Sequence, residues 1–244
     1  MDPEGARKKL SKKTKAIILV HLFGDKCEIQ PWRAMGVPIV EDGTQSLGHK
    51  DEEGVVGSFG DLSIFSFYAP KVITTGEGGM IGVQDPLLAE RLRDMREYDE
   101  KEKLTTRYNY KMTDLSAAVG ITQLDKLNAF IQRRRAIAAD YSRGPFPPGV
   151  LPCNQKDSIF YRYVLRCDQG VKDPMHFFEA RSIAGKRPVY DSLHRLLGLS
   201  DKQFPCAAAH CEKNLSLPLY PSLREEEVEI VHNALKELRH VEVR

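Results

Sequence analysis

The sequence lacks long hydrophobic runs, a leader-like start and a strong charge of either sign, and each absence excludes a class of protein. The longest apolar runs, such as residues 16–20, are far too short to span a bilayer. The start at residues 1–4 is polar and acidic, which predicts no cleavable signal. The formal net charge is +2, so no overall field favours nucleic acid. We therefore expect a cytoplasmic protein that binds neither membranes nor nucleic acid.

Paired cysteines are also absent. The five cysteines are scattered and form no C-x-x-C motif, which is typical of reduced thiols in a cytoplasmic protein. Cys206, His210 and Cys211 lie close together in sequence, but no second ligand pair is spaced to complete a tetrahedral site. We therefore predict no metal.

One basic cluster stands out, with six lysines and arginines within residues 7–15. A cluster of this kind can bind nucleic acid or phosphate. No aromatic residues are interleaved with these lysines for base stacking, so we interpret the segment as a solvated lead-in to the first strand. The alternative, nucleic-acid binding, would make binding depend steeply on salt.

The first half of the chain has the alternating strand and helix pattern of an α/β fold. Short apolar runs typical of buried strands occupy residues 16–21, 37–41, 62–67 and 80–83. Residues 31–35 suit a short helix. Asp85 and Pro86 form an N-cap and a first-turn proline that predict another helix. This order predicts a layered sheet with helical connections.

The second half has a different organisation. Residues 113–142 read as one long helix, and the proline- and glycine-rich residues 144–149 cannot continue it. We predict a domain boundary there, with a large domain over residues 1–143 and a small α+β domain over residues 144–244. In the small domain we expect a strand at residues 159–166, a helix at 175–182 and a capping box at 222–225. The box would open a last helix with four inward-facing side chains: Val228, Val231, Leu235 and Leu238.

Lys71 stands between an apolar strand and the glycine-rich residues 76–79. A lone lysine at a strand end is usually a surface residue. Here its neighbours are apolar before it and small after it, so the amine can be partly buried. Burial favours the neutral amine, because the charged form loses solvation, and a neutral amine can attack a carbonyl.

Asp42 ends the second predicted strand. Such an aspartate is often only a turn or capping residue, and Glu41 beside it is a competing acid. Neighbouring side chains on a strand point to opposite faces, so only one of the two acids can face a ligand. An amine and a carboxylate at two strand ends suit a carbonyl cofactor with a basic ring nitrogen.

These residues resemble a known family over nearly the whole chain. The motif at residues 65–79, FSFYAPKVITTGEGG, and the segment at residues 37–45, VPIVEDGTQ, are similar to those of the DegT/DnrJ/EryC1/StrS sugar aminotransferases. The resemblance implies the fold type I large domain of enzymes that use pyridoxal 5'-phosphate, followed by a small domain. It implies transfer of an amino group, with glutamate as the donor, to a keto-sugar carried on a nucleotide.

The resemblance also implies roles for single residues. Lys71 would hold the cofactor covalently and move the proton, and Asp42 would bind the ring nitrogen. Gln45 would contact the ring oxygen or pack against the ring, and Ser66 would bind the phosphate. Asn109 matches a residue that reaches the phosphate of a neighbouring subunit, which implies a homodimer, although a turn asparagine is an equal alternative. Tyr190 and His194 match a loop that approaches the sugar nucleotide in relatives; structural packing is the competing interpretation for both.

The family also has a further N-terminal part, on the order of a hundred residues, without a counterpart here. It carries a phosphate-binding turn and an aromatic that stacks on the ring. We therefore expect an exposed sheet edge. Three explanations for the missing part remain open: a separate chain that supplies this half, a remnant with a structural or regulatory role, or a truncated gene.

Overall fold

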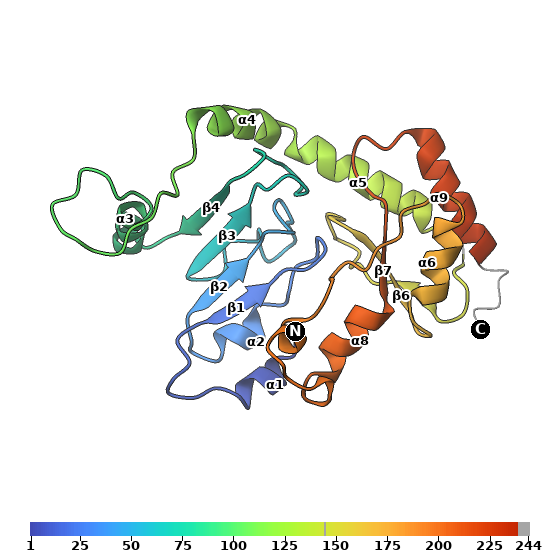
Figure 1. Ribbon diagram of the computed structural model, residues 1–244, viewed down its shortest axis with the longest axis horizontal. Coiled ribbons are helices and arrows are strands. Elements are labelled where there is room, and N and C mark those ends of the chain that lie inside the picture. Colours follow the sequence, from blue (N-terminus) through green and yellow to red (C-terminus); the bar gives the residue numbers. More distant parts are fainter. Residues whose placement is uncertain (144, 239–244) are drawn as a thin grey trace. The chain divides into compact units, whose positions relative to one another are not determined.

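The structure, a computed structural model, describes residues 1–143 and 145–238, and its contacts divide the chain into two compact units. The first unit is Met1–Phe130 and the second is Ile131–Arg244. The predicted domain boundary falls at Gly144, which lies outside the described residues, so that boundary stays a prediction. Each unit has its own sheet (Figure 1).

The first unit is built on a four-stranded sheet of order β1-β2-β3-β4, in which β1, β2 and β3 are parallel and β4 is antiparallel to β3. All four predicted strands are confirmed. The elements are α1 (Pro3–Arg7), β1 (Ile17–Val20), α2 (Gln30–Arg33), β2 (Ile39–Asp42), β3 (Leu62–Ser66), β4 (Gly79–Val83), α3 (Pro86–Met95) and α4 (Asp114–Asp125).

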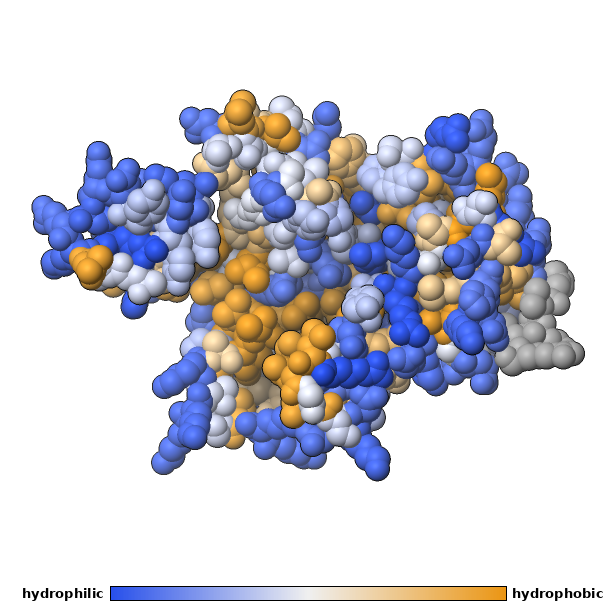
Figure 2. Space-filling view, in the orientation of Figure 1, coloured by the Kyte–Doolittle hydropathy of each residue, from blue (hydrophilic) through white to orange (hydrophobic). Residues whose placement is uncertain are grey.

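The two faces of this sheet differ. One face carries Leu19 and Ile39, which pack with Ile29 and with Trp32 of α2 into a small buried core. Side chains alternate along a strand, so Ile18 of β1 and Ile81 of β4 point to the opposite face, and both are exposed. Figure 2 shows hydrophobic residues gathered over the strands on this second face. β1 and β4 are the two edges of the sheet in the described part of the chain.

The prediction of one continuous helix over residues 113–142 is wrong. Two helices, α4 and α5 (Leu127–Tyr141), meet at Lys126, whose N–H donates to Gln123, three residues back instead of four. This tighter turn ends the α-helical ladder. Apolar side chains on α5 such as Ile131 and Ile137 are buried, whereas the large ones on α4 are exposed. The exposed residues are Leu115, Val119, Ile121 and Leu124.

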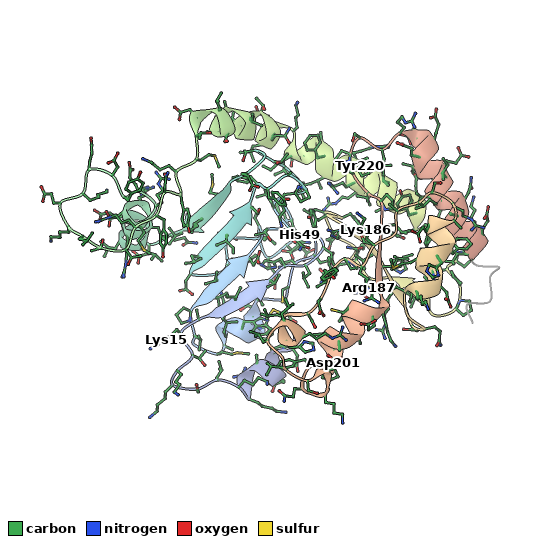
Figure 3. All side chains as sticks on the ribbon, viewed as in Figure 1. Lys15, His49, Lys186, Arg187, Asp201 and Tyr220 are labelled. Carbon is green, nitrogen blue, oxygen red and sulfur yellow. The ribbon has the colours of Figure 1, made fainter. Side chains whose placement is uncertain are left out.

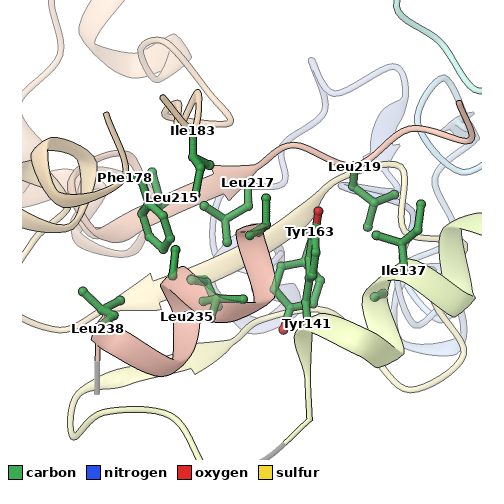
Figure 4. Close-up of a cluster of buried hydrophobic side chains, with 14 of the residues drawn as sticks. Ile137, Tyr141, Tyr163, Phe178, Ile183, Leu215, Leu217, Leu219, Leu235 and Leu238 are labelled. Carbon is green, nitrogen blue, oxygen red and sulfur yellow. The ribbon is translucent and has the colours of Figure 1, made fainter. Parts of the chain in front are cut away.

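The second unit packs its helices on a three-stranded antiparallel sheet of order β5-β6-β7. Its core combines Tyr141 of α5, Tyr163 and Leu165 of β6, Leu215 of β7 and Leu235 of α9, all fully buried (Figure 4). The elements after α5 are β5 (Val150–Pro152), β6 (Tyr163–Cys167), α6 (Lys172–Glu179), α7 (Leu193–Leu196), the 3-10 helix η1 (Asp201–Gln203), α8 (Pro205–Lys213), β7 (Asn214–Leu217) and α9 (Glu225–Leu238).

In this unit, several strands and helices begin or end at other residues than the sequence predicts. The strand predicted from residue 159 begins at Tyr163, because Phe160 has a φ of 50° and breaks the extended chain. The helix predicted at residues 175–182 spans Lys172–Glu179. The predicted capping box at residues 222–225 is wrong: the helix begins at Glu225, and the Arg224 N–H donates to Glu227 at 2.9 Å, which is only half of a capping box because arginine has no acceptor to return the bond.

The inward-facing side chains predicted for the last helix are confirmed, since all four are buried on α9. In the described residues, no helix is both long enough and apolar enough to cross a bilayer.

Candidate active site

The parallel strands β2 and β3 end at the same edge of the sheet, and each end carries a polar side chain predicted for the site. Asp42, the last residue of β2, pairs with Ile64 of β3, and Ser66 is the last residue of β3. Ser66 lies two residues beyond Ile64, so its side chain points to the same face as Asp42. Strand spacing and rise put their Cα atoms roughly 8 Å apart.

Lys71 follows β3 in a loop that the backbone of Phe67 closes. The Phe67 N–H donates to the Gly78 carbonyl at 2.8 Å. The Phe67 carbonyl accepts from the Thr75 N–H at 2.9 Å and from the Thr74 hydroxyl at 3.0 Å. The main chain of one residue therefore joins both arms of the loop, and Lys71 is held, half-buried, at the carboxyl end of β3.

The glycines after this loop are needed for its shape. Gly78 has a φ of +148°, and a Cβ there would lie 2.7 Å from the Thr75 hydroxyl oxygen and 3.0 Å from the Met112 methyl carbon. A Cβ on Gly79 would lie 2.8 Å from the Phe65 carbonyl oxygen. A side chain at either position would push the loop open. The glycines therefore act through turn geometry.

Hydrogen bonds orient the side chains of Asp42, which ends β2, and of Gln45, which follows it. The Thr44 N–H donates to Oδ1 of Asp42 at 3.0 Å, so the second carboxylate oxygen is the one that can accept from a ligand. The Phe23 N–H donates to Oε1 of Gln45 at 2.9 Å. This bond fixes the direction of the Gln45 amide, and its NH2 end is the donor that can face a ligand oxygen.

The structure does not bring Asn109 to the strand ends. Asn109 is exposed in the segment between α3 and α4, which lies beyond β4 in Figure 1. The neighbouring Tyr108 N–H donates to the Met95 carbonyl at 2.8 Å, which ties this segment to the end of α3. A role for Asn109 toward a neighbouring subunit stays a prediction.

Tyr190 and His194 both belong to the second unit. Tyr190 is 94% exposed, whereas His194 is buried. His194 donates from Nε2 to Asp201 at 2.8 Å, and its ring stacks on Phe204. Hydrogen bonds from Arg195 and His194 hold the pKa of Asp201 (labelled in Figure 3) well below its usual range. His194 thus holds the α7 segment against η1, while Tyr190 is the accessible candidate.

Comparison with known proteins decides the family. The sequence model of the DegT/DnrJ/EryC1/StrS aminotransferase family matches residues 1–236. The chain belongs to this family. GDP-perosamine synthase from Escherichia coli O157:H7 is 31% identical over 97% of this chain and 69% of the relative. The synthase from Vibrio cholerae is 30% identical over 96% of this chain and 69% of its own length.

Solved structures agree with the fold. DesV from S. venezuelae has a TM-score of 0.89 at 28% identity, over 99% of this chain and 69% of that protein. Spr1654 from Streptococcus pneumoniae, a putative sugar aminotransferase in its PMP form, has a TM-score of 0.88 at 23% identity, over 98% and 73% of the two chains. The chain therefore has the fold type I architecture of this aminotransferase family.

The family uses pyridoxal 5'-phosphate, and the groups at the strand ends fit this cofactor. The cofactor needs an amine for its aldehyde, a carboxylate for its ring nitrogen and hydroxyl or amide donors for its oxygens. Lys71, Asp42, Ser66 and Gln45 offer this set of groups after adjacent strands. A Cβ on Gly79 would lie 2.8 Å from the Phe65 carbonyl oxygen, so the loop that carries Lys71 requires glycine there.

Sequence reasoning missed a buried pair behind the site. His21, one residue after β1, donates from Nε2 to Oε2 of Glu41 at 3.0 Å, and neither side chain is exposed. Three backbone N–H groups, from Gly57, Phe59 and Gly60, also donate to the Glu41 carboxylate. Burial raises the pKa of Glu41, but the bonds from His21 and these amides outweigh it and leave the pKa below its ordinary value. A histidine directly after a buried strand was the available signal.

We expect the variant Glu41→Gln to be less stable than the wild type by about 3 kcal/mol at pH 7. An amide has one acceptor oxygen, so two of the four donors would face an NH2 group. The pKa of Glu41 is lower in the folded protein than in the unfolded chain. Its contribution to the free energy of unfolding is therefore complete above the unfolded-state pKa of about 4.3 and is lost as the pH falls through the folded-state pKa. Urea unfolding between pH 7 and pH 3 checks both effects.

The matched control is Glu52→Gln, because Glu52 is exposed. The control should unfold like the wild type. The free energy of unfolding of Glu41→Gln should depend less on pH below pH 5 than that of the wild type or of Glu52→Gln. Equal unfolding midpoints for Glu41→Gln and wild type at pH 7 would contradict this account of the pair.

Proposed function

We propose that this chain is an aminotransferase that uses pyridoxal 5'-phosphate to move an amino group from glutamate to a keto-sugar carried on a nucleotide. The observation that carries the proposal is the arrangement of Asp42, Ser66 and Lys71 after two adjacent parallel strands. The two relatives named GDP-perosamine synthases support a nucleotide-linked substrate, because the product in their name is linked to GDP.

Lys71 is the proposed catalytic residue. Its amine would hold the cofactor covalently. Once free, Nζ would take a proton from the carbon of the amino donor and deliver it to the aldehyde-derived carbon of the cofactor, and the reverse transfer would serve the keto-sugar. The closed loop at Phe67 supports this role, because it fixes the main chain around Lys71 after β3 and leaves the residue half-buried. The cofactor, when bound, supplies a ring that withdraws electrons from that carbon.

Asp42, Gln45 and Ser66 are the proposed cofactor-binding residues beside Lys71. The Asp42 carboxylate accepts from the protonated ring nitrogen and keeps that proton in place. The Gln45 NH2 group donates to the ring oxygen, since Oε1 is already engaged by Phe23. The Ser66 hydroxyl binds the phosphate as a neutral donor.

Asn109 would complete the cofactor site of a second subunit, which makes the active form a homodimer or a complex with a chain that supplies an N-terminal half. The exposed apolar side chains of Leu115, Val119 and Ile121 on α4 support a protein partner at this helix. Tyr190 and His194 would serve the sugar nucleotide, Tyr190 by contact and His194 by holding the α7 segment.

The half-reaction with the amino donor tests the proposed function. The purified protein is loaded with pyridoxal 5'-phosphate, freed of excess cofactor and mixed with L-glutamate. We expect 2-oxoglutarate in a one-to-one ratio with bound cofactor, and amination of a GDP- or TDP-linked keto-sugar added afterwards. A protein that binds the cofactor but releases no keto acid from any amino acid would contradict the proposal and favour a non-catalytic structural or regulatory role.

A further inference from the structure

The buried pair of His21 and Glu41 lies on the reverse face of the sheet, directly behind the proposed cofactor carboxylate. Asp42 follows Glu41 on β2, and side chains alternate along a strand. Contacts that fix the position of the Glu41 side chain on one face therefore also fix the main chain of Asp42 and the direction of its side chain on the other face. Glu41 is fully buried, whereas Asp42 is half-buried at the open face.

The hydrogen bonds define the state of the His21 ring. The Cys27 N–H donates to Nδ1 at 3.0 Å, so Nδ1 is the acceptor nitrogen. The proton therefore lies on Nε2, which donates to Glu41 at 3.0 Å. Because one ring nitrogen accepts from a backbone N–H and the other donates to a carboxylate, the ring is fixed in one orientation.

His21 also contacts the backbone of Asp42 itself. The His21 N–H donates to the Asp42 carbonyl at 3.0 Å, and the His21 carbonyl accepts from the Ser46 hydroxyl at 3.1 Å. His21 therefore connects to both sides of the turn that follows β2. One residue thus binds the end of β2 through its side chain and its main chain.

Glu41, the second member of the pair, binds the turn that leads into β3. Glu41 accepts from Gly57, Phe59 and Gly60, which lie in the turn before β3. This turn is tight, because a Cβ on Gly60 would lie 2.8 Å from the Ile39 carbonyl oxygen. The carboxylate therefore ties β2 to the strand that ends at Ser66 and leads to Lys71.

We propose that His21 is a positioning residue that acts through Glu41 to set the direction of the Asp42 carboxylate toward the cofactor ring. The proposal rests on the proposed function for its consequence in cofactor binding. Its structural part, the control of the Asp42 turn by His21, can be measured without cofactor. His21 and Glu41 do not touch the reacting atoms, since they lie behind the sheet.

The test compares His21→Leu, which removes the donor to Glu41, with His21→Gln, whose NH2 group can replace it. Ser63→Ala is the matched control, because Ser63 is equally buried on the same face and donates to the Gly82 carbonyl. Hydrogen exchange of the Thr44 N–H reports the Asp42 turn directly. In the cofactor-free protein we expect this N–H to exchange at least about 10-fold faster in His21→Leu, but within about threefold of wild type in His21→Gln and Ser63→Ala.

The second readout is the affinity for pyridoxal 5'-phosphate, followed by borohydride trapping on Lys71. We expect about 10-fold weaker binding in His21→Leu and recovery in His21→Gln. A folded His21→Leu with wild-type Thr44 exchange and wild-type affinity overturns the positioning role. If the wild-type protein is not labelled with pyridoxyl at Lys71, the proposed function is overturned instead. The Thr44 hydrogen-exchange rates then still test the positioning role.

A third measurement needs no variant, which covers the case in which His21→Leu does not fold. Nitrogen-15 NMR of the wild-type imidazole should show a protonated Nε2 and an unprotonated Nδ1. A ring protonated on Nδ1 alone would leave Glu41 without its donor from His21, and this result would overturn the proposal.

Discussion

Lys71→Ala is expected to lower the rate of transamination by at least about 10³-fold and to abolish covalent attachment of the cofactor. The reason is that one amine performs two tasks, holding the cofactor and moving the proton, so no neighbouring group inherits both. Lys71 follows β3 in a loop closed at Phe67, so its loss leaves the loop bonds and the sheet intact. Single-turnover kinetics with glutamate measure the rate.

Two variants serve as controls for this prediction. Lys71→Arg keeps the positive charge and the length but cannot supply a neutral amine, so it should be as inactive as Lys71→Ala. Lys50→Ala removes an exposed lysine of the same unit and should be active. An active Lys71→Arg variant would assign the effect of Lys71→Ala to charge or packing rather than to covalent chemistry.

Asp42→Asn is expected to lower kcat/KM by about 10²- to 10³-fold while covalent attachment at Lys71 persists. Asparagine keeps the oxygen that accepts from the Thr44 N–H, so the turn is preserved. It removes the negative charge that keeps the ring nitrogen protonated, so the ring withdraws electrons less strongly from the substrate carbon. The two effects separate, because attachment depends on Lys71 and electron withdrawal depends on Asp42.

A cofactor analogue with carbon in place of the ring nitrogen sharpens this test. The wild type loaded with the analogue should lose the same factor as Asp42→Asn with the natural cofactor. The variant with the analogue should lose no more, because the interaction is already absent. Independent, multiplicative losses would show that Asp42 acts on something other than the ring nitrogen.

The strands and the site edge could be predicted from the sequence because each depends on short-range pattern. Apolar runs placed all four strands of the first unit, and polar residues at the end of β2 and in the loop after β3 marked Asp42 and Lys71. The Asp85 cap and Pro86 placed the start of α3, where the Asp85 side chain accepts from the Leu87 N–H. In each case the deciding residues are adjacent in the chain.

What could not be predicted depends on distant partners or on single backbone angles. The pair of His21 and Glu41 spans two strands, and it is completed by amides of a turn that no pattern marks. The break at Phe160 comes from one positive φ in an apolar stretch that reads as a strand. The apolar side chains of Leu115, Val119 and Leu124 on α4 are typical of a buried face, but all three are exposed. Periodicity shows that a face is apolar but does not identify what covers it.

The most direct test of the central claim is to incubate the protein with pyridoxal 5'-phosphate, reduce it with borohydride and map the adduct by peptide mass spectrometry. We predict one pyridoxyl group, on Lys71, with a lower yield in Asp42→Ala at limiting cofactor. Label spread over surface lysines such as Lys8 and Lys12, or no label at Lys71 at saturating cofactor, would contradict the assignment of Lys71 as the cofactor lysine.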